Sequence, residues 1–300
     1  MSDGAWTINT PLARAVAIVI WLLAAFTVLL LGSGVKWLPP LISHHGVEFD
    51  RQLQVTLYVV GIAFVAAQAA LGFVVWRYGA IANGLQRVAF HTRGSKGLEI
   101  AWTVATCVVF VLLAALGQKA WTRMRLQERA VNSIQIEVMA QQFQWNFRYP
   151  GVDKVFGRTA SQFVDDANLN FVGLDESDSR AADDTVVSTL LIPINQPVTL
   201  VMRARDVTHS LWVPPLRLKQ DLVPGLQTRV NFVATRIGKY EIACAELCGA
   251  LHYNMKSFLL VLPESDFREL TQLSGRAFQR RTRELLERYA LKLADDFGKL

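Results

Sequence analysis

The sequence predicts a membrane-anchored protein in which two to three transmembrane α-helices precede an all-β domain and a helical C-terminal tail. Three observations support this fold class. Of the 300 residues, 52% are hydrophobic, and the N-terminal part contains three long uncharged runs. The middle part, residues 126–263, changes to short alternating segments separated by Pro and Gly, a pattern typical of a β-sandwich or barrel. The segment 264–300 is rich in Arg, Glu and Leu, which predicts a helix.

The three uncharged runs cover residues 15–35, 53–76 and 100–117. Each is long enough to cross ~30 Å of hydrocarbon as a helix. We therefore assign residues 50–125 to a transmembrane helical hairpin and residues 1–36 to an N-terminal transmembrane helix. Because small residues follow the first run, a cleaved signal segment remains the alternative for it.

The loop between the second and third runs fixes the expected orientation. It contains Arg77, Arg87, Arg93 and Lys96 and no acidic residue before Glu99. Because positively charged loops stay in the cytoplasm, the chain after the third run is expected on the outer side. The net charge of +6 resides mainly in the membrane part, so nothing indicates nucleic-acid binding.

The expected β domain contains several segments that alternate between apolar and polar residues. Residues 133–140 and parts of 185–201 and 228–235 alternate in this way, and residues 238–244 and 256–262 are also predicted as strands. An acidic insertion, residues 165–184, interrupts them, and we expect either a solvated loop or a docking surface for a basic partner. The tail, residues 264–300, carries both charges along a helical pattern. We expect it to be an exposed amphipathic helix with a structural or subunit-contact role.

The stretch CAELCGALHYNM, from Cys244 to Met255, carries the chemistry-bearing side chains of the outer domain. A disulfide between Cys244 and Cys248 suits the outer compartment but leaves His252 and Met255 unexplained. A zinc site with His209, the other histidine of the β domain, would use both cysteines and both histidines but not the thioether. Thiolates, imidazoles and a weak thioether are instead the ligands of copper electron-transfer sites.

Counting the donors favours two copper ions over one. Two tetrahedral ions need about eight bonds. Two bridging thiolates supply four of these bonds, His209 and His252 two, Met255 a seventh, and a loop carbonyl an eighth. Two ions that share one electron hole through bridging sulfurs would rearrange little on each electron transfer. This interpretation uses every donor of the segment.

The spacing C-x-E-x-C-x3-H-x2-M resembles the CuA motif of subunit II of cytochrome c oxidase, through Cys244, Glu246, Cys248, His252 and Met255. The segments KGLEIAWT, FQWNFRYPG and RDVTHSLWVPPLRLKQDLVPG are also similar to that family. The likeness covers residues 94–262. It implies a Greek-key cupredoxin-like barrel, with His209 as a further copper ligand and the Glu246 backbone carbonyl as the remaining one.

The resemblance also implies roles for residues around the metal. The Glu246 carboxylate is expected to reach a magnesium ion shared with subunit I, Asp206 to support the copper ligands, and Glu99 to serve proton entry. Phe143 stands where the family's exposed electron-entry Trp is expected, and Trp145 matches its second Trp. This departure puts the electron donor's contact with Phe143 in question.

The implied function is that of subunit II of a bacterial haem–copper terminal oxidase in the cytoplasmic membrane, with its copper domain on the outer face. Expected partners are subunit I with the haems and CuB, subunit III, a c-type cytochrome or haem c subunit as donor, and possible supercomplex components. The chain has no C-x-x-C-H, so no haem is expected in it. The alternatives are a quinol-oxidase subunit II, a stand-alone copper protein, and a zinc- or disulfide-stabilised structural domain.

Overall fold

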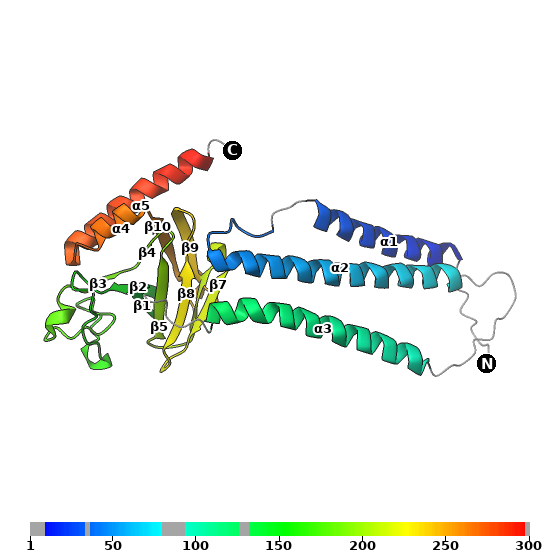
Figure 1. Cartoon of the computed structure of the whole chain (residues 1–300), viewed down its shortest axis with the longest axis horizontal. Helices are drawn as coiled ribbons and strands as arrows, with labels where there is room; N and C mark the ends of the chain where they lie inside the picture. The colour runs from blue at the N-terminus through cyan, green and yellow to red at the C-terminus, as the bar shows by residue number, and fades with distance from the viewer. Residues whose placement is uncertain (1–9, 34–36, 80–93, 126–131, 298–300) are drawn as a thin grey trace. The chain divides into compact units, whose positions relative to one another are not determined.

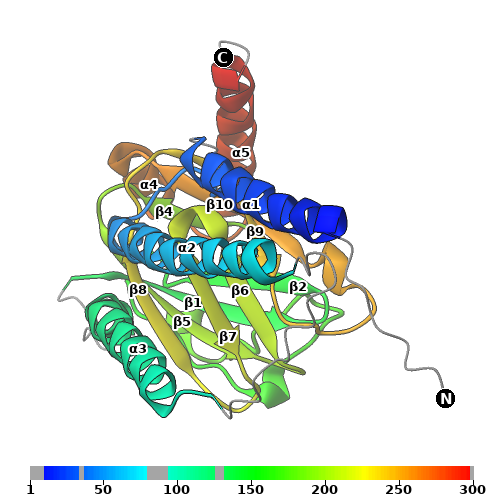
Figure 2. The ribbon, with the colours of Figure 1, turned by 90° about the vertical axis from the view of Figure 1, so that its right-hand side faces the viewer.

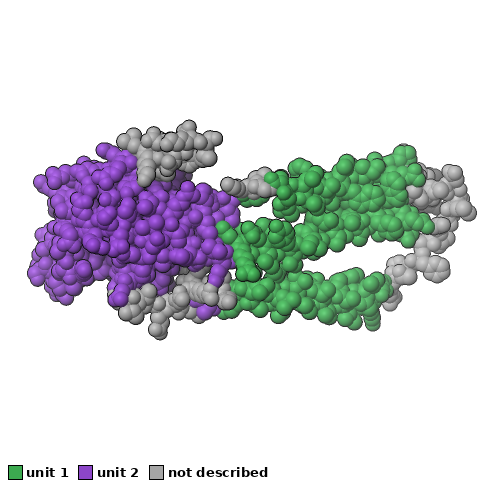
Figure 3. Space-filling model, turned by 45° about the horizontal axis from the view of Figure 1, so that its top comes forward, with its two compact units in different colours: residues 1–37, 50–118 green, residues 38–49, 119–300 purple. Residues whose placement is uncertain are grey.

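The computed structural model describes residues 10–33, 37–79, 94–125 and 132–297. Its elements divide into two compact units, residues 1–37 with 50–118, and residues 38–49 with 119–300 (Figure 3). The first unit is helical. The second contains the β domain and the C-terminal helices (Figure 1).

Three helices in the described part of the chain are long and apolar enough to cross a membrane. They are α1 (Thr10–Gly32), α2 (His44–Tyr78) and α3 (Lys96–Arg125); α2 and α3 contain the second and third predicted runs, and α1 contains the first run up to Gly32. Helices α2 and α3 extend past their uncharged runs at both ends, because helix formers continue the backbone hydrogen bonding into the polar flanks.

Helices α1 and α2 pack through small residues. Gly72 lies against the indole of Trp21, where an added Cβ would come within 2.3 Å of the ring nitrogen. The same indole donates a hydrogen bond to the Ala69 carbonyl at 3.4 Å and stacks on Trp76, with the ring centroids 5.8 Å apart. Close approach at glycine is a common way for helices to associate in lipid.

The β domain consists of two five-stranded sheets (Figure 2). One has the order β3-β2-β1-β5-β8, formed by Thr185–Val187, Gln144–Tyr149, Ile134–Gln141, Pro197–Ala204 and Thr228–Val233. The other has the order β4-β10-β9-β6-β7, formed by Leu190–Pro193, Lys256–Leu262, Gly238–Cys244, His209–Val213 and Leu218–Leu222. Apolar side chains of both sheets form one core, with Ile136, Leu200 and Leu260 fully buried. The predicted fold class is confirmed, and its β part takes the form of a sandwich.

Strands β6 and β7 were not predicted as strands. They occupy the segment that supplies His209, and they pair antiparallel, His209 opposite Leu222. The prolines between them, Pro214 and Pro215, form a short 3-10 turn. Such a turn breaks the alternation that would have marked a hairpin in the sequence.

The connection between α1 and α2 enters the β domain. Ile42 is completely buried in its core, donates its N–H to the Pro215 carbonyl at 3.0 Å and accepts from the Thr235 N–H at 2.8 Å. The Ser43 hydroxyl donates to the Leu216 carbonyl at 2.7 Å. The domain is therefore completed by residues that precede the helical hairpin.

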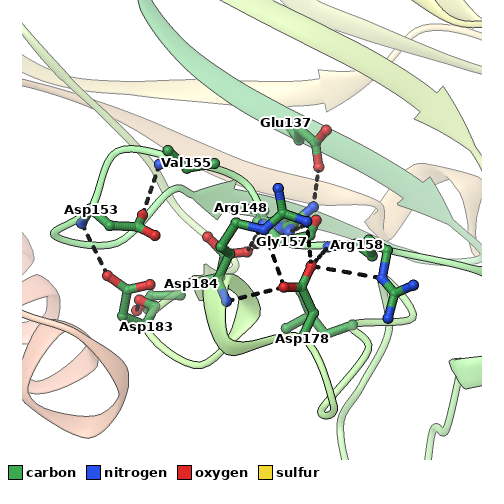
Figure 4. A network of polar contacts seen from close by, with 12 residues as sticks. Glu137, Arg148, Asp153, Val155, Gly157, Arg158, Asp178, Asp183 and Asp184 are labelled. Atoms are coloured by element: carbon green, nitrogen blue, oxygen red, sulfur yellow. Dashed lines mark hydrogen bonds and ion pairs between the residues drawn. The ribbon is translucent and has the colours of Figure 1, made fainter.

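The acidic insertion is exposed over residues 165–169, as a solvated loop would be, but Asp178 and Asp184 are buried in a polar network (Figure 4). Arg148 of β2 is buried and contacts the buried Asp184, Glu137 at 2.6 Å and the Gly157 carbonyl at 2.6 Å. Nearby, Asp178 accepts from the Arg158 N–H at 2.8 Å. The Arg180 guanidinium beside Asp178, together with that N–H, lowers the pKa of this carboxyl from 3.8 to about 2.

The expected amphipathic tail is found, but one of its faces is covered by the domain instead of being exposed. The tail is helical, with α4 (Glu264–Leu270) and α5 (Gly275–Phe297). One face of α5 is buried against the domain, where the Phe278 ring lies 5.2 Å from the Tyr149 ring. Phe278, Thr282, Leu285 and Tyr289 follow helical spacing and are all buried. The amphipathic pattern therefore marks a packing face within the domain.

Candidate metal centre

The predicted metal ligands meet because three neighbouring strands end at the same place. His209 is the first residue of β6, and Cys244 the last residue of β9. Leu211 pairs with Cys244, and β9 and β10 form the next antiparallel pair. Met255 directly precedes β10 and accepts a hydrogen bond at its carbonyl from the Cys244 N–H at 3.2 Å. The loop from 245 to 254 therefore folds over the ends of strands already fixed by the sheet.

The six predicted copper-ligand residues form one cluster. The two cysteine sulfurs are 3.9 Å apart and are not bonded to each other. Nδ1 of His209 lies 3.9 Å from the Cys244 sulfur, and Nδ1 of His252 lies 3.5 Å from the Cys248 sulfur. The Met255 sulfur lies 3.7 Å from Cys248. The Glu246 carbonyl oxygen is 3.2 Å from the Cys244 sulfur.

The cluster is largely shielded from solvent. His209 and Met255 are completely buried, Cys248 is 3% exposed and Cys244 is 8% exposed. His252 is half-buried and connects the cluster to the surface. The fold therefore excludes bulk water from most of these side chains, while His252 remains near the surface.

Asp206 holds the His209 ring in the orientation that ligation requires. Its Oδ1 lies 2.8 Å from Nε2 of His209, so the ring proton is held on that nitrogen. The lone pair of Nδ1 then faces the sulfurs, as in carboxylate–histidine–metal arrangements. The His209 contact and the Gln142 N–H outweigh burial and lower the pKa of the Asp206 carboxyl.

Trp145 forms one wall of the site. Its side chain is 1% exposed, and its indole N–H donates to the Met255 carbonyl at 3.4 Å. Its ring meets the His209 ring edge-on, with centroids 6.3 Å apart. Trp145 thus contacts residues on both sides of the cluster.

The two thiols differ in acidity. Burial raises the pKa of Cys244, but its contacts with the His209 ring and with backbone N–H groups outweigh this and lower the pKa to about 6. Burial and the neighbouring Cys244 charge raise the pKa of Cys248 to about 11. At neutral pH the metal-free pair therefore retains one proton, which a metal ion would displace.

The remaining predicted site residues occupy three different environments. Phe143 is half-buried against Gly249 of the loop 245–254, called the ligand loop below. The Glu246 side chain is exposed, whereas its carbonyl faces Cys244. Glu99 lies in the first turn of α3 in the helical unit, exposed and outside the metal cluster.

Two features of the site were not predicted from the sequence. Large apolar side chains of the ligand loop are exposed, with Leu247 at 79%, Tyr253 at 74% and Leu251 at 45%. The sequence did contain a signal for this exposure, because large apolar residues stand in a loop that has no strand-like alternation. Gln142, which bonds to the ligand loop, gave no signal because its partner is 106 positions away.

The donor set is compatible with copper. Half of the 3.9 Å separation between the sulfurs is shorter than a metal–thiolate bond of about 2.3 Å, so both sulfurs can bind a common ion. His209, Cys244 and Cys248 place their ligand atoms within 4.8 Å of one another. A single tetrahedral zinc ion would leave Met255 and the Glu246 carbonyl without a role, although both face the sulfurs.

Comparisons with known proteins indicate the family of the chain. Residues 134–261 match the family model for the periplasmic domain of cytochrome c oxidase subunit II. The alternative cytochrome c oxidase subunit 2 of Bradyrhizobium diazoefficiens is 32% identical over 255 residues, 84% of this chain and 89% of that protein. The Synechocystis cytochrome c oxidase subunit 2 is 35% identical over 131 residues, 44% of this chain and 30% of that protein.

A solved periplasmic domain of subunit II from Bradyrhizobium japonicum has a TM-score of 0.35 at 23% identity, and the match covers 48% of this chain and 95% of that domain. The family assignment depends instead on the Bradyrhizobium diazoefficiens relative, because the match extends over most of both sequences. The chain therefore belongs to the cytochrome c oxidase subunit II family.

Proposed function

We propose that this chain is the electron-entry subunit of a bacterial haem–copper oxygen reductase. It binds a dinuclear CuA centre, receives single electrons from a c-type cytochrome or haem c subunit, and passes them to haem in subunit I. There oxygen is reduced to water with proton pumping. The observation that carries this proposal is the convergence of two unbonded thiols, two imidazoles, a thioether and a carbonyl in one buried cluster.

The protein's own residues would prepare the site for electron transfer. When bound, the copper pair supplies one-electron redox chemistry. Asp206 fixes the tautomer of His209, and Trp145 closes the site between His209 and Met255. Ligands held by strand ends move little when the charge changes, which favours rapid transfer.

Electron entry is proposed at the exposed part of the ligand loop. His252 is the half-buried ligand, and Leu247, Leu251 and Tyr253 surround its segment with exposed apolar surface. A compact apolar patch excludes water from the contact with a donor. Phe143 and Trp145 lie behind this loop and remain candidates for the entry route.

The proposal places the chain in the bacterial cytoplasmic membrane as a multi-pass protein, with the β domain outside. The basic loop between α2 and α3 supports this orientation. The exposed Glu246 carboxylate is available for a magnesium ion shared with subunit I, and Glu99 for proton entry from the inner side. Subunit III and the donor complete the proposed assembly.

Metal loading of the full-length chain in detergent tests the proposal. It should take up about two copper ions per chain, turn purple and give a mixed-valence EPR signal. Cys244→Ser should abolish the dinuclear centre. Met255→Leu should retain both ions and the colour with a shifted potential, because the thioether is a weak ligand. Uptake of a single ion by the unmodified chain, or a disulfide between the cysteines of the active enzyme, would refute the proposal.

Copurification separates the remaining alternatives. An oxidase subunit should copurify with a haem-containing subunit and show its haem spectrum. A stand-alone copper protein would carry copper without haem. A structural zinc domain would retain zinc on purification and show no visible copper absorption.

A further inference from the structure

Gln142 lies in the turn between β1 and β2 and is not one of the predicted ligands. Its backbone N–H donates to Oδ2 of Asp206 at 2.7 Å. Its side-chain amide donates to the Cys248 carbonyl at 2.5 Å. One residue therefore bonds to both segments that carry the ligands.

These two bonds continue to ligands on each side. The other oxygen of Asp206, Oδ1, holds Nε2 of His209 at 2.8 Å. The sulfur of Cys248 faces the His252 and Met255 ligand atoms. A continuous series therefore runs from His209 through Asp206 and Gln142 to Cys248. These ligands belong to segments that are separated along the chain, and the Ala245 N–H, which donates to the Ser210 carbonyl at 3.0 Å, also joins the two segments.

The ligand loop also comes into direct contact with the turn. Gly249 has φ +137°, a conformation that L-residues rarely adopt. A Cβ at this position would lie 2.8 Å from the Gln142 amide nitrogen and 3.1 Å from the Phe143 ring. The loop backbone thus packs tightly on the turn, at a point where it needs glycine.

We propose that Gln142 is a positioning residue of the metal centre, which fixes the spacing between the segment 206–209 and the ligand loop, residues 245–254. This inference rests on the proposed copper function. The side-chain bond holds Cys248, whereas the backbone bond holds Asp206. Removing only the side-chain amide should therefore loosen the ligand loop and leave the segment 206–209 in place.

Two substitutions separate the hydrogen bond from the shape of the side chain. Gln142→Leu removes the donor and retains bulk, and Gln142→Glu retains the shape but places an acceptor against the Cys248 carbonyl. Gln142 is exposed, so both variants are expected to fold. Gln144→Leu is the matched control, because the Gln144 amide nitrogen has no hydrogen-bond partner among the described residues.

The first readout needs no metal. Amide hydrogen exchange of the copper-free full-length chain should become faster across residues 245–254 in both Gln142 variants. Exchange across residues 205–209 should not change. The control Gln144→Leu should match the unmodified chain in both segments.

The second readout is copper retention against a competing chelator, together with the EPR spectrum. Loss of a residue that orients a metal ligand typically weakens metal binding by about 10- to 100-fold. We expect about tenfold for Gln142→Leu, because the side chain is exposed and water can replace part of the bond. Gln142→Glu should lose at least as much, and both variants should show altered copper hyperfine splitting.

The outcomes distinguish the two proposals. If the unmodified chain forms no dinuclear centre, the copper function fails, whatever the Gln142 variants do. If it forms the centre and Gln142→Leu leaves loop exchange, retention and spectrum unchanged, the positioning role is overturned. If Gln142→Glu behaves as the unmodified chain while Gln142→Leu does not, side-chain shape rather than the hydrogen bond is responsible, and the role stated here is also overturned.

Discussion

Replacement of Arg148 by Met should selectively loosen the acidic insertion. The guanidinium is 1% exposed and holds Asp184, whose side chain is completely buried, as well as Glu137 and the Gly157 carbonyl (Figure 4). Methionine fills much of the same space but supplies no donor. The substitution therefore leaves a buried carboxylate and a carbonyl without this partner.

The size of the effect follows from burial. Removal of one partner from a buried ion pair typically costs about 3–5 kcal/mol. We expect the lower end, about 3 kcal/mol, because Glu137 is 27% exposed and can regain water. Asp184 can also take up a proton, since burial already raises the pKa of its carboxyl despite the arginine.

Hydrogen exchange of the full-length chain measures this local change. A loss of about 3 kcal/mol corresponds to roughly a hundredfold faster exchange in the segment that the network protects. The Gly157 N–H, which donates to Asp184 at 3.0 Å, is the reporter. Copper binding should not change, because the network does not contact the ligand cluster.

Arg158→Met is the matched control. Arg158 pairs with Asp175 and Asp178 in the same insertion, but its side chain is 66% exposed. Exposed pairs contribute about 0–1 kcal/mol. Equal and small changes in exchange for Arg148→Met and Arg158→Met would refute the argument that burial sets the cost.

Three further predictions concern other parts of the chain. First, the hydrogen-bonded Asp178 has a folded-state pKa of about 2 against an ordinary 3.8, so it stabilises the insertion above about pH 4 and loses this effect as the pH falls towards 2. Asp178→Asn should therefore make proteolysis of the insertion less dependent on pH in the acid range. An unchanged pH profile would contradict this. Second, Phe278→Ala should lower the free energy of unfolding by up to about 3–5 kcal/mol, release α5 and expose the tail to protease. Gln279→Ala, at the exposed neighbouring position, should do neither. Equal cleavage of the two variants would argue against the buried face. Third, N-terminal sequencing of the purified chain should find α1 present, because Trp21 packs against Gly72 of α2; a mature chain that begins after residue 35 would show that the segment is removed.

The sequence predicted best those features that local spacing determines. The three apolar runs predicted the long helices, and the short apolar segments between turn residues predicted β9 and β10 with their observed bounds. The metal donors from Cys244 to Met255 were identified because their chemistry is concentrated within one loop. His209 was also found, since it was the only other histidine in the domain.

Features that depend on distant contacts were not predicted. The pattern of α5 correctly indicated two faces, but it could not indicate that the domain covers the apolar one. The sequence around Ile42 resembles an ordinary loop, because its partners, Pro215 and Thr235, are far away along the chain and meet it only in the folded domain. The insertion has seven acidic residues in sequence, and only the structure shows that Arg148 comes from a preceding strand to neutralise part of that charge.

The position of Ile42 has a consequence for how the outer domain is built during synthesis. Its hydrogen-bond partners appear far later in the chain, and both α2 and α3 must be made in between. Contacts across such long separations form slowly. The β core is therefore completed by a residue made before either helix of the hairpin, and a fragment that starts beyond α3 would lack the side chain that fills this position.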